Sequence, residues 1–289
     1  MALRGINAAI NDPSQASTET TLAAILCLSL YEIIAFERPK SIESWLTHTH
    51  GAAVLLELRD GEQLQYEGGF DMFSALRNTA ADIKDGALRD DTMVLSMAME
   101  IDTKLEEFSR ELFANFPFII GTWNGKNSSV NESRHISHYD GNFHIYTSVE
   151  ACDIWNSYRS TRILVSSLLL SHLKPSMRCT ATPTESHPDQ YFNIYYLTKQ
   201  LAIDICQSVP FKLGLTEHGK KNNQAIEAVQ TGAGLTLLYP LYLAAVVGGY
   251  PSPVCVWVMS CLNILGRYLG IGAALFLVGL LPKRKGLVH

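Results

Sequence analysis

The sequence lacks the cysteine pattern of a zinc-binding domain. Its six cysteines include no Cys-x-x-Cys pair, and the two nearest, Cys255 and Cys261, are six positions apart. Thiolate ligands of a structural zinc usually come from shorter local spacings. We therefore expect reduced core thiols in place of a metal site, and no metal or other cofactor.

Positive charge is also not in excess, because 23 Lys and Arg are outnumbered by 28 Asp and Glu, for a formal net charge of −5. Proteins that hold nucleic acid usually carry a basic face, so direct nucleic-acid binding is not expected. Residues 1–11 contain one Arg and no long apolar region, which predicts an intracellular protein without a secretory signal.

The apolar runs of the C-terminal third are too short for membrane spans. Residues 235–247 contain Pro240, and residues 268–281 are fourteen residues long, against about 20 needed to cross hydrocarbon. Arg267 immediately precedes the second run. A membrane anchor is therefore disfavoured, and these runs predict buried helices of a protein core.

Familiar catalytic motifs are missing as well. There is no Gly-x-Ser-x-Gly elbow, P-loop or Rossmann glycine pattern. Asp90 and Asp91 resemble the start of the Mg²⁺-binding motif of terpene cyclases, but Val94 replaces the third carboxylate. This pair therefore predicts a solvated helix start, with acidic groups near the positive end of the helix dipole.

Histidines do not suggest a metal site either. His135, His138 and His144 lie in an Asn-rich stretch and are expected to be exposed loop residues. His48 and His50 are two positions apart, so on one helix they point to different faces and cannot form a zinc pair of the i, i+4 type.

What the sequence does contain is helical periodicity. The clearest amphipathic segment runs from Val94 to Leu112 and has an acidic opposite face. No alternating run is long enough to argue for a sheet. The pattern predicts an all-α multi-helix bundle in a single domain over residues 1–289, with residues 1–21 poorly ordered and with loops at 124–142 and 174–190.

Further helices are expected on the same grounds. They cover residues 22–34, 41–59, 70–77, 145–173, 194–205 (a helix that Pro210 ends) and the apolar C-terminal third.

Several segments carry a resemblance to a known family. They are Leu28–Ile34, Trp45–Arg59, Trp155–Ile163, Ala202–Phe211, Leu238–Ala244 and Trp257–Ala273. Together, in this order, they resemble the regulatory, or middle-homology, domain of fungal-specific transcription factors of the zinc-cluster family. Members of that family normally begin with six closely spaced cysteines amid Lys and Arg, and this sequence has no such cluster.

The resemblance implies a nuclear regulator of a fungal specialised-metabolite pathway. Such a regulator would act through a hydrophobic small molecule, a protein partner or a homodimer, without touching DNA itself. The alternative is a cytoplasmic, cofactor-independent enzyme of the same metabolism, a cyclase or pericyclase whose helical shell holds a hydrophobic substrate. Such chemistry can depend on orientation and a few hydrogen bonds, so it would leave little trace in the sequence.

Charged residues interrupt several apolar helical stretches, and a charge in such a place usually needs a buried partner. The structural interpretation is that these charged residues form interhelical salt bridges. The functional interpretation is a cavity lined by some of these charges together with nearby aromatic and polar residues. The candidate set is Tyr31, Glu32, Trp45, His48, Arg59, Trp155, Arg159, Asp204 and Arg267.

Overall fold

A computed structural model describes residues 2–12, 15, 18, 20–21, 24, 91–123, 136, 138–179, 186–215 and 226–281. Apart from a single position, the helices predicted between residues 22 and 90 lie outside the described residues. The chain divides into two compact units, one of residues 1–71 with 270–273 and one of residues 72–269 with 274–289.

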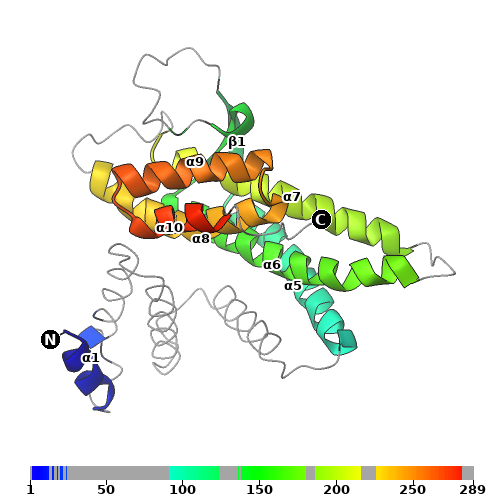
Figure 1. Cartoon of the computed structure of the whole chain (residues 1–289), viewed down its shortest axis with the longest axis horizontal. Coiled ribbons are helices and arrows are strands. Elements are labelled where there is room, and N and C mark those ends of the chain that lie inside the picture. Colours follow the sequence, from blue (N-terminus) through cyan, green and yellow to red (C-terminus); the bar gives the residue numbers. More distant parts are fainter. Residues whose placement is uncertain are drawn as a thin grey trace. The chain divides into compact units, whose positions relative to one another are not determined.

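The first unit contains helix α1, Ala2–Ile10, in a segment that the sequence predicted to be poorly ordered (Figure 1). The Asn11 side chain donates a hydrogen bond to the Asn7 carbonyl at 2.8 Å. The backbone N–H of Asn11 donates to the same carbonyl at 3.2 Å, so Asn11 binds the last turn of the helix with two donors.

Most of the described helices belong to the second unit. They are α5 (Asp91–Asn115), α6 (Val149–Cys179), α7 (Ser186–Lys212), α8 (Ile226–Gly248), α9 (Pro253–Tyr268) and α10 (Gly272–Leu280). The first two residues of α10 fall in the range of the first unit. Helices thus dominate the described residues, and the predicted all-α class is confirmed.

A small β-hairpin interrupts this helical order, and the sequence did not predict it. Strand β1, Phe118–Thr122, pairs antiparallel with β2, Asn142–Tyr146. Each strand has five residues and apolar side chains on both faces, so the alternation that marks a strand is absent. The prediction that Ile145 begins a helix is therefore wrong, because α6 starts at Val149.

Helix α5 confirms the predicted amphipathic segment. Ala98, Leu105 and Leu112 are seven positions apart and at most 3% exposed, whereas Glu100 and Glu106 face solvent. The buried stripe packs against α6, so its burial is what holds this helix on the bundle.

Helix α6 packs against α5, α7, α8 and β2 (Figure 1). Between Ala151 and Leu173, the exposed residues are Ser157, Leu164 and Ser171, a stripe with a seven-residue spacing, and five others are partly exposed. The α6 helix continues to Cys179 and α7 begins at Ser186, so the connection is shorter than the predicted loop at 174–190.

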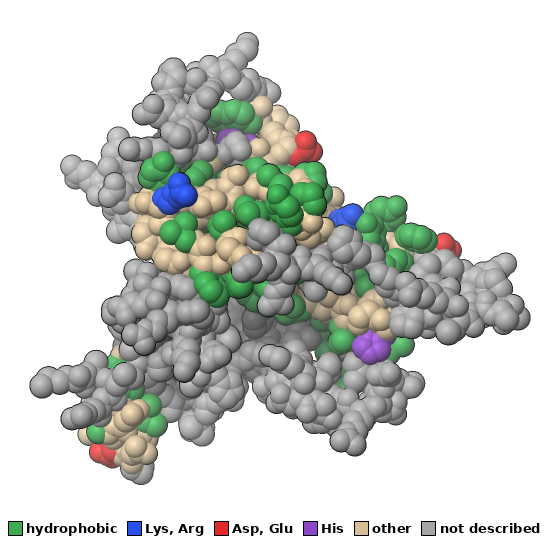
Figure 2. Space-filling model, viewed as in Figure 1, with side chains coloured by type: hydrophobic (Ala, Val, Ile, Leu, Met, Phe, Trp, Pro, Cys, Tyr) green, Lys and Arg blue, Asp and Glu red, His purple; other side chains and the backbone are tan. Residues whose placement is uncertain are grey.

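The C-terminal helices form core, as predicted. Leu237, Leu241, Leu262 and Leu265 are at most 1% exposed. Among the described residues, no helix is both long and apolar enough to cross a membrane. Figure 2 shows hydrophobic side chains gathered along the side of α9 as well, so part of the apolar surface remains uncovered.

Two details of the helices depend on single residues. Pro210 lies inside α7, which ends at Lys212, so the prediction that this proline ends the helix is wrong by two residues. Gly266 lets α9 and α10 approach closely, because a Cβ there would be 2.4 Å from Leu275 Cγ. A larger residue at this crossing would overpack the interface.

Candidate functional site

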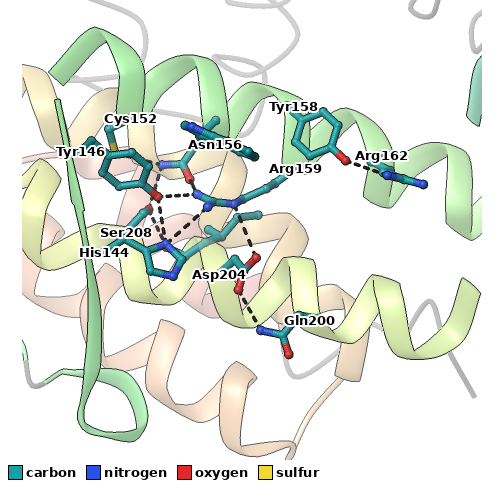
Figure 3. A network of polar contacts seen from close by, with 12 residues as sticks. His144, Tyr146, Cys152, Asn156, Tyr158, Arg159, Arg162, Gln200, Asp204 and Ser208 are labelled. Carbon is teal, nitrogen blue, oxygen red and sulfur yellow. Dashed lines mark hydrogen bonds and ion pairs between the residues drawn. The ribbon is translucent and has the colours of Figure 1, made fainter. Parts of the chain in front are cut away.

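A buried arginine organises the polar centre of the bundle. Arg159 on α6 is 1% exposed. Its Nη1 donates to the Tyr146 hydroxyl at 2.6 Å and to Asn156 Oδ1 at 3.1 Å, and its Nη2 lies 3.3 Å from His144 Nδ1 (Figure 3). These contacts tie β2 to α6 through charge-assisted hydrogen bonds.

The charge of Arg159 is balanced from two sides. Asp204 on α7 lies with Oδ2 3.9 Å from Arg159 Nε, an ion pair too long for a hydrogen bond. The Gln200 amide donates to the other oxygen of this carboxylate at 2.8 Å. The guanidinium carbon also lies 5.3 Å from the Phe118 ring centroid and 5.2 Å from that of Trp155, distances at which aromatic faces attract a cation.

The neighbouring histidine is held neutral. Arginine only donates, so Nδ1 of His144 accepts from Arg159 and carries no proton. The Tyr146 hydroxyl accepts from Arg159 and can donate its own proton to Nδ1, 3.0 Å away. Burial and the nearby guanidinium lower the pKa of His144 from 6.5 to about 3, because a protonated ring would face Arg159 in a dry site.

Asn156 extends the cluster toward α7. Its Nδ2 donates to Ser208 Oγ at 2.9 Å and lies 3.7 Å from Cys152 Sγ, and Ser208 donates to the Ile205 carbonyl at 2.7 Å. Burial raises the pKa of the Cys152 thiol to about 12, so this sulfur stays protonated and is a poor nucleophile.

Trp155 connects the cluster to β1. Its indole N–H donates to the Phe116 carbonyl at 2.8 Å, and its ring meets Phe118 edge-on with centroids 5.0 Å apart. The Trp155 side chain is 6% exposed. It therefore fixes the chain between α5 and β1 as well as flanking Arg159.

Two more cations are buried beside the cluster. Arg162 Nη1 donates to the Tyr158 hydroxyl at 2.7 Å, and its Nε lies 3.2 Å from Asp102 Oδ1. Lys212 pairs with Asp153 between α7 and α6. The carboxylate of Asp102 thus joins α5 to α6.

The structure brings three of the sequence candidates together: Trp155, Arg159 and Asp204. Arg267 does not join them. It was expected to need a buried partner, but it is exposed in the last turn of α9, where a cation is favoured by the helix dipole. The remaining candidates, Tyr31, Glu32, Trp45, His48 and Arg59, lie outside the described residues.

Sequence reasoning missed the two residues that β2 contributes. His144 was expected to be exposed in a loop, but it is 1% exposed, and Tyr146 is 5% exposed. The correction follows from the hairpin, which turns both side chains toward α6. An available signal was the aromatic-rich run Asn142–Tyr146, because aromatic residues are enriched in strands.

As a chemical site, this cluster satisfies itself. Arg159, His144, Tyr146 and Asn156 use their polar atoms on one another, as a structural network does. Within the described ranges, no group of three or more His, Cys, Asp or Glu side chains is placed to hold a metal ion.

Comparison with known proteins finds a similarity in the first part of the chain. Residues 1–83 match the family model described as the fungal specific transcription factor domain, which confirms the resemblance predicted from the sequence. The match lies before the helices α5 to α10. This all-α chain is therefore similar, over its first 83 residues, to the domain of fungal specific transcription factors.

A particular relative is the protein named transcription factor dbaG of Emericella nidulans, 28% identical over 144 residues. The similarity covers 48% of this chain and 32% of the relative. The chain thus spans about a third of the length of the curated relative that it matches. No solved structure matches the chain significantly.

Proposed function

We propose that this chain is a transcription-factor-like regulator of a fungal specialised-metabolite pathway, acting in the nucleus through a hydrophobic small molecule or a protein partner. The observation that carries the proposal is the match of residues 1–83 to the fungal specific transcription factor domain. The relative named as a transcription factor supports the same role. With a formal net charge of −5, the chain is not expected to bind DNA directly.

Two properties of the described helices support action through contacts with other molecules. The polar cluster around Arg159 is internally satisfied, which suits a rigid scaffold better than a reactive centre. Apolar side chains are also exposed on the C-terminal helices, with Val256 on α9 at 46% and Leu275 on α10 at 41%. Exposed apolar surface of this kind favours an interaction role.

The test is deletion of the gene in the fungus, with transcript and metabolite profiling. Coordinated loss of the transcripts of one biosynthetic pathway, restored by the full chain, is the expected result. Intact transcripts with accumulation of one uncyclised intermediate would overturn the proposal and support the cyclase alternative.

Complementation variants sharpen this test. Trp45→Ala lies within the matched residues 1–83 and should fail to restore the transcripts. Tyr196→Ala is the matched control, because this aromatic side chain lies outside the matched residues and is 66% exposed. Immunoblots should show equal amounts of both variants, and equal rescue by both would contradict a regulatory role for the matched segment.

A further inference from the structure

The β1–β2 hairpin has the reverse of the usual distribution of polar and apolar side chains. Cross-strand pairs share a face, so Phe118 with Tyr146 and Ile120 with His144 belong to the inner face. The outer face carries the pair Ile119 and Ile145, together with other apolar side chains. A hairpin packed on one side normally turns polar residues to water.

The outer face is exposed on its β1 side, whereas Phe143 and Ile145 on β2 are partly buried. Ile119 is 64% exposed and Trp123 is 39% exposed. Between them, the Phe143 ring lies over Gly121, within 2.6 Å of where a Cβ would be. The His138 ring stacks on Trp123, with centroids 4.5 Å apart, so the exposed apolar surface of the outer face centres on Ile119, beside the glycine.

Within the described ranges, the outer edge of β1 is unpaired. The Trp123 N–H donates to the Gly141 carbonyl at 2.7 Å, so Trp123 directs its backbone toward β2. By the alternation of an antiparallel ladder, Ile119 and Gly121 do the same, whereas Phe118, Ile120 and Thr122 direct their N–H and C=O groups away from β2. Among the described residues, no backbone hydrogen bond outside the hairpin uses these groups. Ile120, at the middle of this edge, is 64% exposed.

We propose that this edge pairs with the same edge of a second copy of the chain. The two β1 strands would run antiparallel about a twofold axis at Ile120, forming one four-stranded sheet from two hairpins. In this register Ile120 lies opposite its own equivalent, and Ile119 lies opposite Gly121 of the second copy. The outward groups of Phe118, Ile120 and Thr122 then all find partners, since Phe118 lies opposite Thr122.

Self-complementarity is the reason for choosing a second copy over an unrelated strand. A twofold interface uses the same patch on both molecules, so each residue must fit its symmetry partner. Here the large exposed Ile119 meets a glycine, and the two Ile120 side chains meet each other, an apolar pair of β-branched residues. The pairing also removes an exposed apolar strand edge, which is otherwise an aggregation hazard.

The register can be tested with single cysteines in the full chain. Directly opposed residues in a hydrogen-bonded antiparallel pair have Cα atoms about 5.5 Å apart, within the range for a disulfide. Ile120→Cys should therefore give a covalent dimer under mild oxidation. Thr122→Cys is the matched control, because its equivalent would be about 14 Å away along the paired strands. The unsubstituted chain, with its six native cysteines, should stay uncrosslinked.

The equilibrium is tested by sedimentation velocity over a range of concentrations. The full chain should show a concentration-dependent dimer, and Ile120→Lys should weaken dimerisation by about tenfold or more, because two like charges would meet at the axis. Tyr196→Lys introduces the same charge at an equally exposed site on α7 and should leave the dimer unchanged.

Three results would overturn the proposal. The first is a protein that stays monomeric at every concentration up to about 100 μM. The second is a dimer that Ile120→Lys does not weaken. The third is equal crosslinking of the two cysteine variants. None of them bears on the regulatory role, which the transcript experiment tests separately.

Discussion

The exposed ion pairs of α5 and the buried cluster of α6 use the same kinds of charge in opposite surroundings. On α5, Lys104 Nζ lies 2.7 Å from Glu100 Oε1 and Arg110 Nη2 lies 2.8 Å from Glu106 Oε1. In the interior, Arg159 is 3.9 Å from its carboxylate. By distance alone, the surface pairs are the stronger ones.

Burial reverses that order. The side chains of Arg110 and Glu106 are 72% and 53% exposed, so water screens their attraction. Arg159 is 1% exposed, and its hydrogen-bond partners come from β2 and its own helix. The comparison teaches that the cost of leaving buried groups without partners, more than the length of one ion pair, decides what a charge contributes.

The largest effect should come from removing the buried cation. Arg159→Met should lower the free energy of unfolding by about 3–5 kcal/mol, because Tyr146, Asn156 and Asp204 lose their common partner. Arg110→Met is the matched exposed control and should cost only about 0.3–0.5 kcal/mol. Urea denaturation midpoints measure both, and similar midpoints would break the comparison.

The second largest effect should separate a buried apolar residue of α5 from its exposed neighbour. Leu105→Ala should lower the free energy of unfolding by about 2–5 kcal/mol, because this fully buried side chain fills the contact with α6. Its neighbour Glu106 is exposed, so Glu106→Ala should change stability by less than about 0.5 kcal/mol. If the two variants unfold at the same urea concentration, the inward face of α5 has been misassigned.

A smaller effect should appear as a dependence on pH. The pKa of His144 falls from 6.5 to about 3 on folding, so between these values the unfolded chain binds one proton more than the folded chain. Stability should therefore fall as the pH is lowered through this window, by about 1.4 kcal/mol per pH unit from this residue.

The control for this slope is His144→Gln, which cannot titrate but retains an acceptor for Arg159. Free energies of unfolding of both proteins should be compared at pH 7 and pH 5. The wild-type protein should lose roughly 2 kcal/mol more than the variant. Equal losses would mean that His144 is protonated in the folded protein at pH 5.

The helices could be predicted because their signals are local. In α5, a buried residue every seventh position and an acidic opposite face specify the helix and its inward side. The hairpin could not be predicted, because the sequences of β1 (FIIGT) and β2 (NFHIY) place apolar side chains on both faces and carry no period-two pattern.

The candidate site was predicted in part for the same reason. A charge within an apolar stretch pointed to Asp204, and the family resemblance pointed to Arg159. The partners of Arg159, His144 and Tyr146, come from a strand whose position depends on tertiary packing. Arg267 shows the converse error. Its apolar neighbours suggested burial, yet it lies on the solvent side of a helix end.

Because most of α6 is buried under other elements, its position affects hydrogen exchange in the second unit. Backbone amides exchange with solvent hydrogen when their helix is locally exposed, and the most protected amides exchange only with global unfolding. Apart from the stripe of Ser157, Leu164 and Ser171 and five partly exposed residues, residues 151–173 are buried, and α6 packs against α5, α7, α8 and β2. The amides of this stretch should therefore be the slowest to exchange, and their rates report the global stability of the unit directly.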